Sequence, residues 1–179
     1  HKSGSQTLVL NHKSCLTTSS LIGTCKNFVH QSISAKQFKR VFKLNLPHLV
    51  YINSLVSYSA AAASYHCRIP CIWHIRELFE DAGGEMKIPH LIGKPLIQNQ
   101  INKFASKIIV NSRAVARNVV PAKSKLKTTV IPNSVSTKFF KFSQDVKSSR
   151  KELKLPLDAP IVGIPATLRP VKGHLFFIK

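Results

Sequence analysis

Short apolar runs rich in β-branched residues alternate along the chain with longer segments of mixed character. Hydrophobicity within each run is continuous, which is typical of parallel strands that are covered on both faces. Turn-forming or polar residues border each run. We therefore predict strands at residues 7–10, 48–53, 71–75, 107–112, 128–133 and 160–165.

Several of the intervening segments carry apolar residues at helical spacing, of which Ile97 and Ile101 are an example. Ser112 is a good N-cap, and the helix that it opens would end before Pro121. Helices are predicted at residues 31–44, 55–66, 90–105 and 112–120. Strands that alternate with helices predict an α/β fold with a doubly wound parallel sheet.

A change of composition at residues 141–158 indicates a domain junction. This segment is polar and charged, and Pro156 lies within it. We predict an N-terminal α/β domain at 1–140, a linker at 141–158 and the start of a second α/β domain at 159–179. The final segment is too short to fold alone, so we expect the chain to be a fragment.

The charge of the chain is strongly unbalanced, with 27 Lys and Arg residues against 7 Asp and Glu and a formal net charge of +20. Such an excess predicts an anionic partner: nucleic acid, anionic lipid or phosphorylated metabolites. Aromatic residues do not alternate with the basic ones as in known nucleic-acid-binding motifs, so we expect no specific nucleic acid. No apolar run approaches the roughly 20 residues of a membrane span. We expect a cytoplasmic protein, with an anionic membrane surface as an additional partner.

Polar side chains follow the predicted strands at their carboxyl ends, where ligands bind in open parallel sheets. They are Asn53 and Ser54, then His74, Arg76 and Glu77, then Asn111, Ser112 and Arg113, and finally Asn133 and Ser134. Taken singly, Ser54 and Ser112 are ordinary helix caps. Taken together, the four strand ends favour a cleft that binds a polar ligand.

Acidic residues gather after one predicted strand, where Glu77, Glu80, Asp81 and Glu85 lie close together in sequence. The cluster has no Asp-x-Asp pair that would hold a divalent metal. It can be a solvated loop, a group that orders nearby Lys and Arg, or the source of a catalytic carboxylate. Glu77 is the best candidate for catalysis because it adjoins the end of the strand.

A zinc site at His66, Cys67, Cys71 and His74 is rejected on geometry. Residues 71 and 74 point to opposite faces of a strand, and no spacing here matches a zinc ribbon or finger. Buried free thiols are the better interpretation of the cysteines. We predict no metal site.

A second basic group, Arg169 and Lys172 with Gly173, lies in the segment "RPVKGH" between a predicted strand and a predicted helix. Cations beside backbone amides at such a position suit phosphate groups. The Gly-rich signatures of P-loop and dinucleotide-binding proteins are absent.

Five segments in order resemble glycosyltransferase family 4, the retaining GT-B sugar transferases. They are "PHLVYINSL", "IPCIWHIRELFED", "SKIIVNSRAVARNV", "TTVIPNSVSTKFF" and "LKLPLDAPIVGIPATLRPVKGH", and the resemblance covers about residues 45–179. The resemblance implies an N-terminal acceptor-side domain, a C-terminal domain for a nucleotide-sugar co-substrate, and catalysis in the cleft between them without a metal. It also implies that the acceptor is a sugar or a lipid-linked or cell-envelope molecule.

The resemblance assigns roles to residues. Arg76 occupies the position of the family's catalytic His and His74 lies two residues earlier, so either can take that role, with Glu77 as the adjacent acid. Lys172 matches the lysine that contacts the donor phosphates, and Arg169 can replace the family's arginine. The family's second acidic motif, the E-x7-E of the C-terminal domain that holds the nucleotide-sugar, is absent because the chain ends first. Two alternatives therefore stand: a non-catalytic remnant that binds a glycan or an anion, and a basic nucleic-acid-binding protein.

Overall fold

The computed structural model describes residues 6–10, 21–82, 86–88, 93–137 and 145–178, without the side chains of residues 21–25, 27, 28 and 82. The described chain divides into two units, His1–Pro132 and Asn133–Lys179. In chain order the elements of the first unit are α1 (Leu21–Asn45), β1 (Val50–Asn53), η2 (Leu55–Ser57), α2 (Tyr58–His66), β2 (Cys71–Ile75), η3 (Glu80–Ala82), α3 (Gly93–Phe104), β3 (Lys107–Val110), α4 (Arg113–Val119), η4 (Ala122–Lys127) and β4 (Thr128–Val130). The second unit holds α5 (Val146–Glu152), η6 (Pro170–Lys172) and α6 (His174–Ile178).

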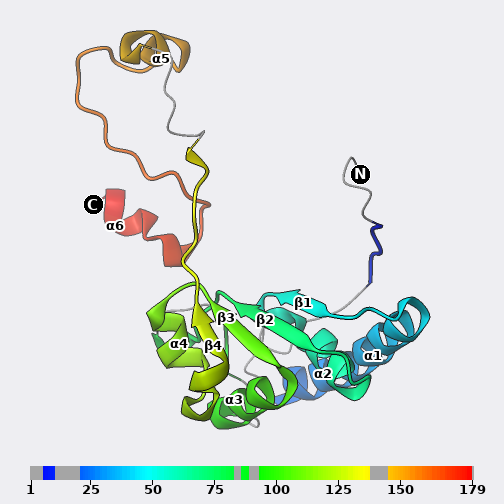
Figure 1. Cartoon of the computed structure of the whole chain (residues 1–179). Helices are drawn as coiled ribbons and strands as arrows, with labels where there is room; N and C mark the ends of the chain where they lie inside the picture. The colour runs from blue at the N-terminus through cyan, green and yellow to red at the C-terminus, as the bar shows by residue number, and fades with distance from the viewer. Residues whose placement is uncertain (1–5, 11–20, 83–85, 89–92, 138–144, 179) are drawn as a thin grey trace. The chain divides into compact units, whose positions relative to one another are not determined.

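The strands form one parallel sheet in the order β1-β2-β3-β4 (Figure 1). Asn53 pairs with His74 and Ile75 pairs with Val110, so the carboxyl ends lie at one edge. The expectation that Asn53 and Arg76 share an edge is therefore confirmed. β4 ends at Val130, earlier than predicted, because Pro132 has no N–H to continue the ladder.

One face of the sheet forms the core. Cys71, Trp73 and Ile75 of β2 are completely buried, whereas Ile72 and His74 between them are half-buried. The helices α1, α2, α3 and α4 lie on one side of the sheet (Figure 1). Of these, α2 and α4 contact the strands. No described helix of the first unit covers the opposite face, so coverage of both faces, as expected from the sequence, is not observed within this unit.

Two sequence predictions of strands are wrong. Residues 7–10 and 160–165 form no strand, and Val9 and Val162 are largely exposed. Both segments have β-branched residues, but a strand is stable only when a neighbouring strand satisfies its backbone groups. The helix predictions at 31–44, 55–66, 90–105 and 112–120 are confirmed where the residues are described.

Helix caps follow local chemistry. Ser112 accepts a hydrogen bond from the backbone N–H of Val115 at 3.2 Å, as its predicted N-cap role requires. At the C-terminus of α3, the Lys127 ammonium group donates to the carbonyl oxygens of Asn102 and Ala105, the latter at 2.6 Å. Partial burial lowers the pKa of Lys127. No helix in the described part of the chain is long and apolar enough to cross a membrane.

The Lys127 contacts generate a stability prediction. Lys127→Met removes two charge-assisted hydrogen bonds from the C-terminus of α3 and should lower the free energy of unfolding by about 1–2 kcal/mol. Chemical denaturation measures this change. Lys125→Met is the matched control, because Lys125 is exposed and its change should stay within about 0.5 kcal/mol. Equal losses in both variants would contradict the capping role.

Candidate functional site

The carboxyl edge of the sheet brings together the polar residues predicted from β1, β2 and β3. Asn53 and His74 are register partners on adjacent strands. The side-chain amide of Asn111 donates to the carbonyl oxygen of Arg76 at 3.4 Å, which links the ends of β2 and β3. Arg113 is exposed at the start of α4. These residues therefore lie at the ends of neighbouring strands, on the same edge of the sheet.

His74 is the best-positioned side chain at this edge. Its Nδ1 shares a 2.8 Å hydrogen bond with the Tyr51 hydroxyl, and the two rings meet edge to face. Its Nε2 is buried and has no hydrogen-bond partner among the described residues, and the same holds for Oδ1 of Asn111. Buried polar atoms without partners are rare in native proteins, so both atoms are candidates to contact a ligand.

Glu77 has a structural task at the same edge. Its Oε2 accepts the backbone N–H of Leu55 and the backbone N–H of Arg76, each at 3.0 Å. The carboxylate thereby joins the turn after β1 to the turn after β2. Arg76 itself is exposed. Glu77 holds the edge in shape, and a direct catalytic role would have to use its other oxygen.

Ser54 has an unusual backbone conformation. Its φ of 143° and ψ of 150° fall in a region that is essentially restricted to glycine. The other described non-glycine residues with positive φ are Leu46, Arg68 and Lys154, which follow helices, where left-handed conformations are common. Two hydrogen bonds hold Ser54 in this conformation. Its carbonyl oxygen accepts one from the Trp73 indole N–H at 2.9 Å, and its hydroxyl oxygen accepts one from the backbone N–H of Val56 at 3.2 Å.

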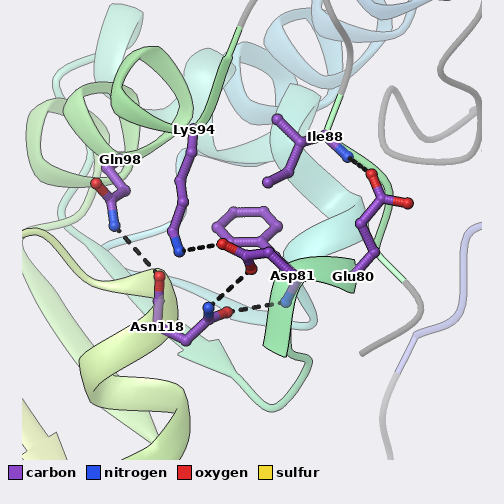
Figure 2. Close-up of polar contacts among 7 residues, drawn as sticks. Glu80, Asp81, Ile88, Lys94, Gln98 and Asn118 are labelled. Carbon is purple, nitrogen blue, oxygen red and sulfur yellow. Dashed lines mark hydrogen bonds and ion pairs between the residues drawn. The ribbon is translucent and has the colours of Figure 1, made fainter. Parts of the chain in front are cut away.

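Residues of the acidic cluster hold the loop after β2 in place. Asp81 accepts hydrogen bonds from Lys94 of α3 at 2.7 Å and from the Asn118 amide of α4 at 2.9 Å (Figure 2). Asn118 also accepts the N–H of Phe79, and Glu80 accepts the N–H of Ile88. Asp81 fits one of the three interpretations of this cluster, because it orders the nearby Lys94 side chain. Glu85 lies outside the described residues.

Other predicted site residues belong to the second unit. Asn133 is exposed and lies beyond the end of β4. Arg169 precedes the short turn η6 and Lys172 is its last residue, and Gly173 follows it with a φ of 72°, a conformation that suits glycine. These residues and those at the edge of the first unit therefore belong to different units.

A hollow of about 650 Å³ lies elsewhere, at the amino end of β2 and β3. Tyr65, His66, Lys103 and Phe104 line it, and no predicted site residue does. The C-termini of α2 and α3 meet there, beside the cations Arg68 and Lys103. The hollow is open and its lining has no unpartnered buried atom, so the carboxyl edge remains the better candidate.

Metal-ligating side chains do not cluster. In the part of the chain that is described, no three His, Cys, Asp or Glu side chains lie close enough together to hold a metal ion. Cys71 is buried, and desolvation raises the pKa of its thiol. Cys67 is half-buried and also a free thiol.

Sequence reasoning missed Tyr51, although its two-residue spacing from Asn53 places both on the face of His74.

The strain at Ser54 can be tested by two substitutions. Ser54→Gly should raise the free energy of unfolding by about 1 kcal/mol, because glycine adopts this conformation freely and serves nearly as well as a cap. Ser54→Ala keeps the strain and loses the hydroxyl cap, so it should lower the free energy by about 1 kcal/mol. Thermal or urea unfolding measures both. A destabilised Ser54→Gly variant would contradict the strain.

The Asp81 contacts predict a pH effect. The hydrogen bonds from Lys94 and Asn118 lower the pKa of Asp81 in the folded protein. The stability that they provide is therefore complete above the ordinary carboxyl pKa of about 3.9 and is lost as the pH falls through the folded pKa. Asp81→Asn should lose less stability than the wild type on acidification, as measured by urea unfolding at several pH values. Asp145→Asn, at a position without a side-chain cap, should follow the wild type.

Comparisons with known proteins do not assign this edge. No protein-family model matches the chain, and no curated protein matches it. The chemistry of the edge must therefore be inferred from its own residues.

Proposed function

We propose that the carboxyl edge of the sheet binds a sugar hydroxyl and that the protein acts as a retaining, metal-independent glycosyltransferase of the GT-B type. The observation that carries the proposal is the pair of buried, unpartnered atoms, Nε2 of His74 and Oδ1 of Asn111. An unsatisfied buried polar atom costs about 1–3 kcal/mol. A ligand that pairs with both atoms recovers this free energy, and sugar hydroxyls can both donate and accept.

The residues of the edge have different roles in this proposal. His74 contacts the reacting acceptor hydroxyl, because Tyr51 fixes its ring and leaves Nε2 for the ligand. Arg76 is exposed and cationic, so it meets negative charge that develops as the donor phosphate leaves. Glu77 keeps the two turns in register. Further acceptor contacts come from Asn53, Ser54, Ser112, Arg113 and Asn133.

The donor is a nucleotide-sugar, whose leaving diphosphate needs charge stabilisation during transfer. The motif resemblance supports Arg169, Lys172 and Gly173 as the residues that contact it. Two cations beside the η6 turn supply this stabilisation without a metal. The acceptor is a sugar or a lipid-linked or cell-envelope molecule.

Binding without turnover is the second candidate function. The observation that favours it is the use of Oε2 of Glu77 in two backbone hydrogen bonds. An oxygen that accepts two backbone hydrogen bonds is not free to contact a substrate hydroxyl. The same edge would then hold a glycan but would not catalyse transfer.

Nuclear magnetic resonance titration with a panel of soluble oligosaccharides tests the site. We expect backbone amide shifts at Asn53, His74 and Asn111, because these residues surround the unpartnered atoms. His74→Ala should weaken binding at least tenfold, which corresponds to about 1.4 kcal/mol. His66→Ala is the matched control, since His66 is exposed and lies at the end of α2.

Incubation with labelled nucleotide-sugars separates the two candidates. A glycosylated product together with released nucleoside diphosphate supports the transferase. Oligosaccharide binding without product supports the second candidate. If no oligosaccharide shifts the signals of the edge, or if His74→Ala binds as well as His66→Ala, both are contradicted.

A further inference from the structure

The positive charge of the chain is distributed unevenly. All seven Asp and Glu residues lie at or after Glu77, whereas the preceding residues contain nine Lys and Arg and no acid. α1 falls entirely within this part of the chain. Its cations therefore have no carboxylate nearby in sequence, and the described structure shows no ion pair on the helix.

The two sides of α1 differ in burial. Gln31 and Ser34 are buried, Phe38 packs against the core, and the helix lies beside α2 (Figure 1). With 3.6 residues per turn, the opposite side carries residues at steps of three and four. We call this side the outward face of α1; its members are Lys26, Val29, Ile33, Lys36, Lys39, Arg40, Lys43 and Leu44.

The outward face combines cations with exposed aliphatic side chains. Val29, Ile33 and Leu44 are 60%, 49% and 74% exposed, which is unusual for three large apolar residues on one helix face. Lys36, Lys39, Arg40 and Lys43 surround an open hollow of about 410 Å³ together with Leu44. Such a hollow can accept a phosphate-sized group between the cationic side chains.

We propose that the outward face of α1 is a docking surface for a membrane with anionic lipids. Lys and Arg near such a membrane are attracted by its negative surface potential. Val29, Ile33 and Leu44 enter the boundary between headgroups and acyl chains, as the apolar residues of interfacial helices do. The helix lies on the membrane and does not cross it.

Charge and side-chain chemistry favour a lipid surface over other occupants. A second copy of the chain would bring the same cations face to face in a two-fold interface, and they would repel one another. A nucleic acid would attract the cations but would gain little from three exposed aliphatic residues. The rings of Phe38 and Phe42 are partly buried on the packed side, so they do not offer a stacking surface.

Flotation with lipid vesicles tests the proposal on the whole chain, independently of any sugar transfer. Vesicles of phosphatidylcholine with phosphatidylglycerol should bind the protein, and vesicles of phosphatidylcholine alone should bind it far more weakly. Binding should fall as salt rises, because the Debye length decreases from about 10 Å at 0.1 M to about 3 Å at 1 M.

Matched charge reversals identify the surface. Replacement of Lys36, Lys39, Arg40 and Lys43 by Glu should weaken binding to the anionic vesicles at least a hundredfold. The control replaces Lys107, Lys125, Lys147 and Lys151 by Glu, which gives the same net charge and should change binding less than tenfold. Ile33→Ser with Leu44→Ser should weaken binding several-fold at constant charge, and circular dichroism checks that all variants fold.

Three results would overturn the proposal. One is equal binding to both vesicle types, and another is equal loss in the two charge-reversed variants. The third is tight binding of duplex DNA or single-stranded RNA that the α1 reversal abolishes and the Ile33→Ser, Leu44→Ser variant leaves unchanged, without vesicle binding. That outcome would identify the outward face as a nucleic-acid surface.

Discussion

The indole N–H of Trp73 joins the core of the first unit to its candidate site. Trp73 is completely buried and packs near the Tyr58 ring of α2, so its Nε1 hydrogen needs an acceptor away from water. The acceptor is the carbonyl of Ser54, whose backbone consequently remains in a conformation suited to glycine. Leu55 then presents its N–H to Glu77. The shape of the polar edge thus depends on how one core side chain is satisfied.

The gathering of acid in a basic chain has a physical reason. The loop after β2 must be fixed against α3 and α4, and both helices offer donors that a carboxylate can bind: Lys94 on α3 and Asn118 on α4. Asp81 supplies two acceptor atoms at this junction. The acid in this loop thereby fixes the loop after β2 to two helices beside the candidate site.

The sequence predicts the strands correctly where a segment has high strand propensity and also has neighbouring strands to pair with. Cys71–Ile75 and Lys107–Val110 are continuous apolar runs, and each has a neighbouring strand on both sides. Residues 7–10 and 160–165 have the same local signal but no strand beside them, and pairing is a tertiary property that composition does not encode. The contacts of His74 with Tyr51 and of Asp81 with Asn118 depend on long-range register, so the residue types suggest a polar edge but not its hydrogen bonds.

The order β1-β2-β3-β4 also has a consequence for the rate at which the first unit forms. Each strand pairs with the next one in sequence, so only one connecting helix must be enclosed before each new ladder can close. The entropy lost on closing a loop grows with its length, and parallel pairings over long separations are slow for that reason. A sheet assembled between sequence neighbours avoids the longest closures, and it can grow strand by strand as the chain leaves the ribosome.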